Sequence, residues 1–281
     1  MVKSLVLENI SVGFKLPQGV FYAVDDVSLN LHGGNFTAII GESGCGKSVL
    51  GQAILNILPS GVVKKGRVLY NGEQVKKILS AFGIIPQNPS ESLNPVRKIG
   101  KQMQDILAVH NITDGDNSYK KQCLRLFGLQ EAERVLAAYP HELSGGMLQR
   151  VLCAMAVSSK PEWILADEPT KGLDEQVGAV VRKNLLTIKQ DLRLSMLIIT
   201  HDIALAQEVC DDVLVMYAGQ VLEHNADIWH KPLHPYTKGF LQALPKNGLQ
   251  VIPGKAPVPG ESFTGCKFAA RCPYCTTRCK E

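Results

Sequence analysis

One stretch of ten residues has the composition of a phosphate-binding loop. Residues 39–48 read Ile-Ile-Gly-Glu-Ser-Gly-Cys-Gly-Lys-Ser, which contains the pattern G-x-x-x-x-G-K-S. The glycines let backbone N–H groups turn inward around an anion, and the following helix start adds partial positive charge. Lys47 is predicted to reach the β- and γ-phosphates, and the Ser48 hydroxyl to bind Mg²⁺. We expect nine residues to contact a nucleoside triphosphate: Gly41, Glu42, Ser43, Gly44, Cys45, Gly46, Lys47, Ser48 and Val49.

Two acidic residues follow an apolar run at 163–166. A carboxylate at the C-terminal end of a strand can hold the Mg²⁺ bound to Ser48, and Asp167 is predicted to do so. Glu168 is predicted to polarise the attacking water. A solvated strand end is the alternative for an isolated Asp-Glu pair. The phosphate loop earlier in the chain favours the catalytic interpretation.

A second helix start has the features of an anion site. Leu143, Ser144, Gly145, Gly146 and Met147 open a helix that is predicted to run to about residue 158. The hydroxyl of the serine can cap this helix, and the two glycines let its N–H groups approach an anion. Because one chain needs only one such site for a triphosphate, the second is predicted to serve the nucleotide of another chain.

The hydrophobic pattern predicts the elements that position these residues. A buried strand at 36–40 precedes the loop, and a helix at 47–58 follows it. Period-two alternation from residue 5 and over 24–31 predicts a β-rich N-terminal layer, and a strand at 68–70 ends at the hairpin-type turn Asn71-Gly72. After a short strand at 82–85, helical periodicity occupies 92–158.

Strands are expected again at 163–166, 196–200 and 213–217, with helices at 175–190 and 203–209. This alternation predicts an α/β protein whose parallel sheet is covered on both faces. From residue 227 proline and glycine are frequent, which predicts an extended tail with a short helix near 235–243. We expect four segments: core residues 1–88, a helical subdomain at 89–158, core residues 159–226 and a C-terminal extension at 227–281.

Charge and hydropathy restrict the cellular role. The net charge of +4 is too small to indicate a nucleic-acid partner, so none is predicted. No apolar run approaches the roughly 18 residues of a membrane span, and the N-terminus does not resemble a signal peptide. The chain is therefore expected in the cytoplasm, with any membrane role peripheral.

Four of the eight cysteines crowd the C-terminal end. Cys266, Cys272, Cys275 and Cys279 have the spacing C-x₅-C-x₂-C-x₃-C, and in a reducing compartment such a cluster suggests a metal more than disulfides. The other four are predicted to be buried or bystander thiols.

The order of these motifs resembles that of the ABC transporter ATPase family. Gln87 follows a strand, Gly172-Leu173-Asp174 follows the acidic pair, and His201 follows the strand at 196–200. The resemblance implies an ABC-type P-loop ATPase with a mixed core sheet, an N-terminal antiparallel β layer, an α-helical subdomain and a Pro/Gly-rich C-terminal extension with a Cys cluster. It also implies two cassettes that sandwich ATP head to tail.

The resemblance assigns roles to single residues. Gln87 would contact Mg²⁺ or the attacking water, Asp174 the opposite cassette, and His201 the γ-phosphate while orienting Glu168. A structural histidine is the alternative for His201. An aromatic platform for adenine is assigned to Phe14, with Tyr22 as the second candidate and a core position as the alternative for Phe14.

A finer resemblance is to the ATPase subunits of dipeptide, oligopeptide and nickel importers. It rests on 87–89 with 92–96, on Pro-Leu-His-Pro-Tyr-Thr at 232–237, and on 252–254, 265–268 and 271–273. A valine at position 49, directly after Ser48, resembles the sequence of the first of the two paralogous ATPases that these importers carry. The run Met147-Leu148-Gln149-Arg150 resembles the nickel-type members. The implied partners are a second ATPase that is a paralogue of this chain, two transmembrane permease subunits and an extracytoplasmic solute-binding protein. The resemblance also implies that the chain lies at the cytoplasmic face of the membrane. Peptide, nickel and metal chelate all stay open as cargo.

Several members of this group hold a [4Fe–4S] cluster with four thiolates, and Cys266, Cys272 and Cys279 match their positions. Cys275 is the candidate for the fourth ligand, because the usual fourth cysteine would lie beyond Glu281. Zinc is the alternative metal. Two other classes of protein are alternatives to an importer ATPase: a soluble ABC ATPase of DNA repair or translation, and a small-molecule P-loop kinase or pure metal-binding protein. The short insertion without heptads disfavours the former, and the Leu-Ser-Gly-Gly and Gly-Leu-Asp motifs disfavour the latter.

Overall fold

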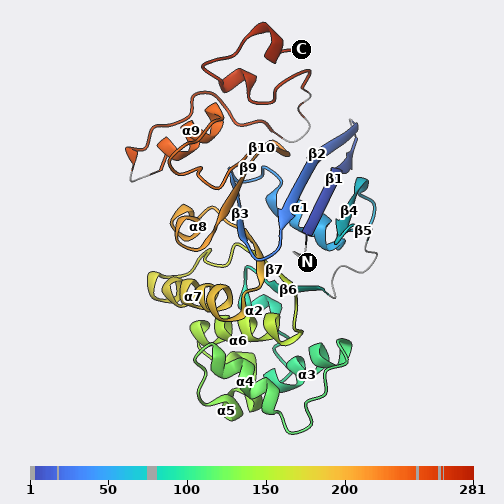
Figure 1. Ribbon diagram of the computed structural model, residues 1–281, viewed down its shortest axis with the longest axis vertical. Coiled ribbons are helices and arrows are strands. Elements are labelled where there is room, and N and C mark those ends of the chain that lie inside the picture. Colours follow the sequence, from blue (N-terminus) through green and yellow to red (C-terminus); the bar gives the residue numbers. More distant parts are fainter. Residues whose placement is uncertain (1–3, 18, 75–80, 245–246, 259–260, 262) are drawn as a thin grey trace. The chain divides into compact units, whose positions relative to one another are not determined.

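A computed structural model of the chain describes residues 4–17, 19–74, 81–244, 247–258, 261 and 263–281. The chain divides into two compact units (Figure 1). Unit 1 comprises Met1–His32, Thr37–Lys76 and Cys210–Glu281, and unit 2 comprises Gly33–Phe36 and Lys77–Val209. In this division the strands at 82–85, 163–167 and 195–199 fall with the helices. The four functional segments expected from the sequence stay a prediction.

Unit 1 contains a four-stranded antiparallel sheet in the order β2-β1-β4-β5. Its strands are β1 (Ser4–Leu16), β2 (Gly19–His32), β4 (Val63–Tyr70) and β5 (Glu73–Gln74). Leu5, Leu7, Leu29 and Leu31 are buried on one face, as period-two alternation requires. Asn71 and the glycine after it have positive φ angles of 53° and 82° between β4 and β5, so the predicted hairpin turn and N-terminal layer are confirmed.

Unit 1 also contains three strands that pair in both parallel and antiparallel directions. β3 (Phe36–Gly41) lies parallel to β9 (Asp212–Tyr217), and β10 (Gln220–His224) pairs antiparallel with β9. Every residue of β3 is buried. Helix α1 (Lys47–Leu55) ends earlier than the predicted residue 58, because Asn56 takes a left-handed conformation (φ 58°) and its N–H caps the helix.

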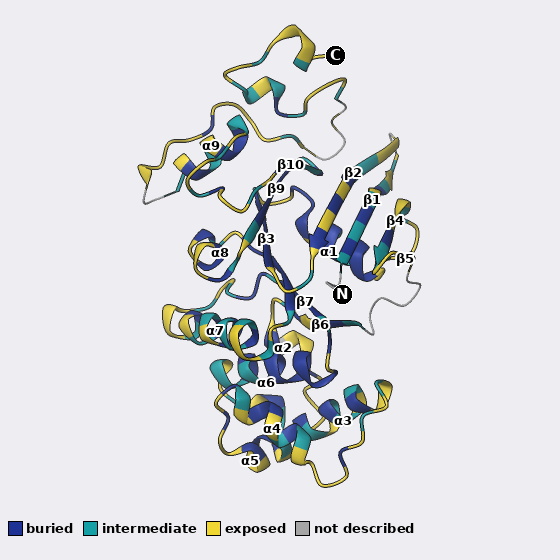
Figure 2. Cartoon of the chain, viewed as in Figure 1, coloured by how far each residue is buried: buried dark blue, intermediate teal, exposed yellow. Residues whose placement is uncertain are grey.

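Unit 2 contains three parallel strands, β6 (Phe82–Ile85), β7 (Trp163–Asp167) and β8 (Ser195–Ile199), with β7 between the other two. Among the described residues from 86 to 162 there is no strand, which confirms the predicted helical insertion. Its helices are α2 (Pro89–Ser92), α3 (Ile99–Val109), α4 (Ser118–Leu126), α5 (Ala132–Ala137) and α6 (Gly145–Ser158). Helices α3 and α4 pack against α6, which is buried over its C-terminal two-thirds, and α5 packs against α3 and α4 (Figures 1 and 2).

Two further helices of unit 2 follow strands. Helix α7 (Glu175–Thr187) continues as a π-helical turn over Ile188–Leu192, so the predicted helix at 175–190 is slightly shorter than the helical segment observed. Helix α8 (Ile203–Val209) has its predicted bounds. Within the ranges that the structure describes, none of the helices is both long and apolar enough to traverse a lipid bilayer.

The C-terminal extension packs into unit 1 instead of running as a purely extended tail. Its predicted short helix is present as α9 (Pro235–Gln242), and 3₁₀ turns occupy Ala269–Arg271 and Thr277–Cys279. Tyr236 and Phe268 of the extension are fully buried together with Tyr217 of β9. Their ring centroids lie 4.6–5.4 Å apart, so aromatic burial offsets the high proline and glycine content.

Candidate nucleotide-binding and hydrolysis site

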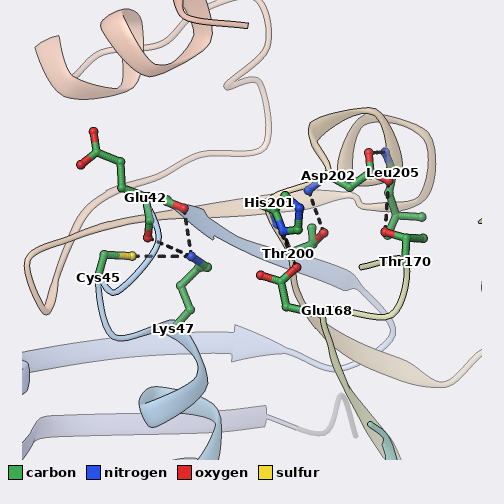
Figure 3. A network of polar contacts seen from close by, with 10 residues as sticks. Glu42, Cys45, Lys47, Glu168, Thr170, Thr200, His201, Asp202 and Leu205 are labelled. Atoms are coloured by element: carbon green, nitrogen blue, oxygen red, sulfur yellow. Dashed lines mark hydrogen bonds and ion pairs between the residues drawn. The ribbon is translucent and has the colours of Figure 1, made fainter. Parts of the chain in front are cut away.

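The phosphate loop connects β3 to α1 in unit 1. Lys47, the first residue of α1, is buried, and its Nζ donates to the carbonyl oxygens of Gly41 (2.9 Å) and Glu42 (3.0 Å) (Figure 3). Ser43 and Gly44 are exposed at the tip of the loop. The loop is therefore formed around the lysine amine, which can exchange these carbonyls for phosphate oxygens.

Two glycines of the loop are required by their surroundings. Gly46 has φ 104°, and a Cβ there would lie 2.1 Å from the carbonyl oxygen of Ala23. Gly41 has φ 149°, and a Cβ there would lie 2.2 Å from the carbonyl oxygen of Met216. Other residue types would push the loop away from β2 and β9. This close packing gives the backbone cradle that a nucleotide phosphate needs.

Cys45, Ser48 and Val49 were also predicted to contact the triphosphate, and these contacts stay predictions. Ser48 is exposed and Val49 half-buried on the first turn of α1. The thiol of Cys45 is buried 3.9 Å from Lys47 Nζ, and burial raises its pKa, so it stays a neutral thiol.

Both aromatic candidates for adenine lie on the antiparallel sheet of unit 1. Phe14 on β1 is half-buried opposite Phe21 of β2, so it is not a fully buried core residue. Tyr22 on β2 is also half-buried, and Lys65 Nζ lies 5.1 Å from its ring centroid. A cation already occupies one face of the Tyr22 ring, which favours Phe14 as the stacking residue.

The predicted catalytic pair is brought together in unit 2. Glu168 follows β7 with φ 49°, a left-handed conformation that is strained for a side-chain-bearing residue. Its N–H donates to the carbonyl of Ile199 on β8 (2.8 Å), and its Oε2 lies 2.6 Å from His201 Nδ1 (Figure 3). The Glu168 side chain is 11% exposed and that of His201 is 58% exposed. A largely buried carboxylate thus lies against a histidine that is open to a ligand.

A polar network fixes the turn that carries His201 (Figure 3). Asp202 accepts from the hydroxyl of Thr170 (3.1 Å) and from the N–H of Leu205 (2.9 Å), which caps α8. The N–H of Asp202 donates to the hydroxyl of Thr200 (2.9 Å). Sequence reasoning did not assign Thr170 and Asp202 a role. The signal that could have found Asp202 is an acidic residue directly before an apolar helical run.

Two of the three predicted Mg²⁺ ligands lie at or just after strand ends in unit 2. Asp167 is the last residue of β7 and is half-buried. Gln87 is exposed two residues after the end of β6. Ser48, the third predicted Mg²⁺ ligand, belongs to unit 1. Carboxylate, amide and hydroxyl oxygens suit Mg²⁺, so the donor set fits this ion.

The second predicted anion site begins α6. The Ser144 hydroxyl accepts from the N–H of Met147 (3.4 Å), which confirms the predicted cap. A Cβ on Gly145 or Gly146 would meet nothing within 4 Å, so the space beside these two glycines is open. Leu143 and Met147 are half-buried on either side. The helix start is accessible to an anionic ligand.

Asp174 has a local structural partner. Its carboxylate accepts from the N–H of Val177 (2.9 Å) and caps α7. The residue is exposed, as a contact to a second cassette requires. That contact stays a prediction.

The four C-terminal cysteines share a small hydrogen-bonded segment. The N–H of Cys266 donates to the carbonyl of Cys279 (2.9 Å), and that of Cys275 donates to the carbonyl of Cys272 (3.3 Å). The pKa of the Cys279 thiol is lowered, first by the Thr276 hydroxyl (3.4 Å) and to a smaller extent by the Cys275 thiol. Over the described ranges, no group of three or more His, Cys, Asp or Glu side chains is arranged to hold a metal ion. Four thiolates are the right donor types for iron–sulfur or zinc, but their side chains are not gathered around one point.

These features define a class of protein: an ATPase in which a phosphate loop, a Glu-His pair and a second anion-binding helix occur in one cassette. Residues 24–171 match the family described as ABC transporter, and residues 222–279 match the oligopeptide/dipeptide transporter C-terminal region. The chain belongs to the ABC transporter family, as an ATP-binding subunit of its oligopeptide/dipeptide transporter group.

Similar proteins extend over nearly the whole chain. The oligopeptide transport ATP-binding protein OppD of Haemophilus influenzae is 35% identical, and the match covers 98% of this chain and 91% of the relative. The dipeptide transport ATP-binding protein DppD of Escherichia coli is 37% identical, with 98% and 90% covered. The solved structure of cbiO1 from Clostridium perfringens, part of the ABC transporter complex cbiONQ, has a TM-score of 0.65 and 26% identity and covers 79% of this chain and 88% of its own.

The comparisons confirm the predicted ABC-type ATPase fold and the prediction that the chain is an ATP-hydrolysing subunit of an ABC transporter. The match over residues 222–279 favours a transporter subunit over a soluble ATPase of DNA repair or translation, since the matching family is the C-terminal region of oligopeptide/dipeptide transporters. The roles of single residues stay predictions.

Proposed function

We propose that this chain hydrolyses ATP to drive an importer of dipeptides or oligopeptides. The observation that carries the proposal is the combination of the ABC transporter match at 24–171 with the oligopeptide/dipeptide region at 222–279. The names of the OppD and DppD relatives support a peptide cargo. Nickel or a metal chelate is the alternative cargo. The resemblance of residues 147–150 to the nickel-type members suggests it, but none of the matches reported above supports it.

Each part of the site has a proposed role in hydrolysis. The phosphate loop and Lys47 hold the triphosphate. Ser48, Asp167 and Gln87 would hold Mg²⁺, which would supply positive charge against the phosphates. Glu168 polarises the attacking water, and His201 orients Glu168 and contacts the γ-phosphate. The 2.6 Å contact between their side chains supports this pairing. The strained backbone of Glu168 supports a functional constraint at this position.

A second ATPase subunit, which we propose to be a paralogue, completes the site. The open space beside Gly145 and Gly146 supports binding of the partner's nucleotide at the start of α6. Ser144 and Met147 flank that start, and Asp174 is exposed for the opposite cassette. The two cassettes would close on ATP and reopen after hydrolysis.

A groove beside Gln87 supports docking of a permease subunit. It has a volume of about 450 Å³ and lies wholly within unit 2. Residues on both sides of Gln87 in the chain, Pro86 and Leu93, line it, and so does the ion pair of Arg97 with Asp105 (2.6 Å). A lining of apolar and charged side chains suits a short helix of a membrane subunit. We therefore propose that the chain is peripheral at the cytoplasmic face of the membrane, with two permeases and an extracytoplasmic solute-binding protein as partners.

We further propose that Cys266, Cys272, Cys275 and Cys279 hold a [4Fe–4S] cluster, with zinc as the alternative. Their shared hydrogen-bonded segment and their donor type support a metal. An absorption spectrum and metal analysis of protein purified without oxygen test this. We expect broad iron–sulfur absorption that Cys272→Ser removes. Stoichiometric zinc would establish the alternative, and a native chain without metal would refute both.

Reconstitution tests the transporter proposal. The chain, its second ATPase and both permeases are placed in proteoliposomes, and ATP hydrolysis is measured with solute-binding protein loaded with a mixed di- and oligopeptide pool or with Ni²⁺. We expect stimulation by peptide. Stimulation by Ni²⁺ alone would overturn the peptide cargo. A full hydrolysis rate from this chain alone, without any second cassette, would overturn the two-cassette proposal.

A further inference from the structure

The C-terminal extension of unit 1 reaches back to a residue of the phosphate loop. Arg271 Nη1 donates to both carboxylate oxygens of Glu42, at 3.1 and 3.2 Å. The Arg271 side chain is only 7% exposed, and its Nε donates to the carbonyl of Pro253 (3.1 Å). Its guanidinium also lies over the ring of Tyr217, 5.7 Å from the centroid. A cation held on three sides is preorganised to fix the position of the carboxylate that it binds.

A second contact from the extension reaches the same loop residue. The N–H of Glu42 donates to the hydroxyl of Tyr236 on α9 (3.2 Å). Burial raises the pKa of Tyr236, so its hydroxyl stays neutral and accepts this bond without placing a negative charge beside the loop. The ring of Tyr236 is itself fixed by packing against Tyr217 and Phe268. Glu42 is therefore held by its main chain and by its side chain at once.

The contacts of Glu42 divide between two directions. Its carbonyl oxygen accepts from Lys47 Nζ inside the loop, while its carboxylate points away from that amine (Figure 3). The carboxylate thus does not neutralise Lys47, because Arg271 takes up its charge. This arrangement leaves the positive charge of Lys47 available for phosphate.

We propose that Arg271 and Tyr236 are positioning residues for ATP binding, which act through Glu42 to hold the phosphate loop in its open, anion-ready shape. Neither residue needs to touch the nucleotide. Without them the carboxylate of Glu42 is free to turn toward Lys47 and compete with phosphate. The extension is then a working part of the ATP site. This inference rests on the proposed binding of ATP by residues 41–49, and on no assumption about cargo or metal.

Nucleotide affinity tests the proposal, measured with a fluorescent ATP analogue on the full chain and as KM and kcat in the complex. Arg271→Met is expected to weaken ATP binding about tenfold, the scale of one charged hydrogen-bond pair, with kcat at saturating ATP nearly unchanged. Arg271→Lys should recover part of this loss. Glu42→Gln should weaken binding less than Arg271→Met does, because a neutral side chain cannot pair with Lys47.

A double variant separates positioning from general damage. Because Arg271 acts through Glu42, adding Glu42→Gln to Arg271→Met should restore affinity toward that of Glu42→Gln alone. Tyr236→Phe removes only the hydroxyl and should weaken binding a few-fold while the ring stays packed. The matched control is Arg278→Met, which removes an exposed cation of the same segment and should leave affinity unchanged.

Three outcomes would overturn the proposal: native affinity in a folded Arg271→Met chain, independent and additive losses in the double variant, or an equal loss in Arg278→Met. If Arg271→Met does not fold, Tyr236→Phe decides, and native affinity there refutes the proposal. Lys47→Ala distinguishes failure of the underlying site. Nucleotide binding that survives Lys47→Ala would refute the assignment of the loop itself, whereas its loss together with native binding in Arg271→Met refutes only the positioning role.

Discussion

Replacing Glu168 with glutamine changes one atom of the proposed catalytic pair. Both side chains have the same shape, and both are L residues with the same tolerance for φ 49°, so the substitution adds no new backbone strain. The glutamine amide can still bond to His201 Nδ1, 2.6 Å away in the native pair. The free energy of unfolding should therefore change by less than about 1 kcal/mol.

The same change should be severe for catalysis. A positioned general base contributes roughly 10²–10⁴ in rate, which corresponds to about 3–5 kcal/mol of activation free energy. We expect phosphate release in the complex to fall by that factor while ATP binding is retained. ATP should then hold the two cassettes closed, because it binds the closed pair and is not consumed. Size-exclusion chromatography with ATP and Mg²⁺ would detect this pair.

The control for Glu168→Gln is Glu131→Gln, the same chemical change in an exposed pair with Arg134. It should leave hydrolysis and the melting temperature unchanged. Phosphate release at the native rate in Glu168→Gln would show that Glu168 is not the base. A large loss of stability in that variant would show instead that its carboxylate has a structural role.

Three further predictions follow from other parts of the structure. Lys47→Ala should weaken nucleotide binding by at least about a hundredfold in a fluorescence titration, because the buried amine inside the loop is removed. Ser144→Arg should keep the chain's own nucleotide binding but abolish hydrolysis in the complex, since the new side chain fills the open space at the start of α6; unchanged hydrolysis would contradict the partner contact. For Glu223, burial alone would raise the pKa, but the N–H groups of His234 and Leu233 (2.9 Å each) lower it overall from the ordinary 4.5. A lowered pKa stabilises the folded chain above pH 4.5, and this stabilisation is lost as the pH falls through the folded-state value. The melting temperature of Glu223→Gln should therefore be below native at pH 7 and approach it in acid, and a gap that is constant with pH would contradict this.

Local signals predicted the parts of the fold whose cause is local. The apolar run of β3 and the turn at Asn71 were identified because period and turn chemistry lie within a few residues. The end of α1 was misplaced because Asn56 caps it within a continuing apolar run. Strand β10 was not predicted, since it is short and mostly half-buried and pairs with β9 through an irregular register.

The candidate site divides in the same way. Motif spacing predicted roles for Lys47 and Glu168, and the family resemblance predicted one for His201, because each follows a strand with a recognisable pattern. No spacing could identify the contact of Arg271 with Glu42, whose partners are 229 residues apart in the chain. Such a contact depends on the tertiary packing of the extension, and a single sequence shows only that an arginine precedes Cys272.

The aromatic packing of the extension matters to anyone who would shorten this protein to a minimal cassette. Cutting the chain after residue 226 would remove Tyr236 and Phe268 and lay bare the ring of Tyr217, which is 1% exposed in the intact chain. The uncovered ring belongs to strand β9, so its exposure would create an apolar surface patch that promotes aggregation. Low solubility of such a fragment would then result from the loss of these aromatic contacts. The fragment would therefore not represent the properties of the whole subunit.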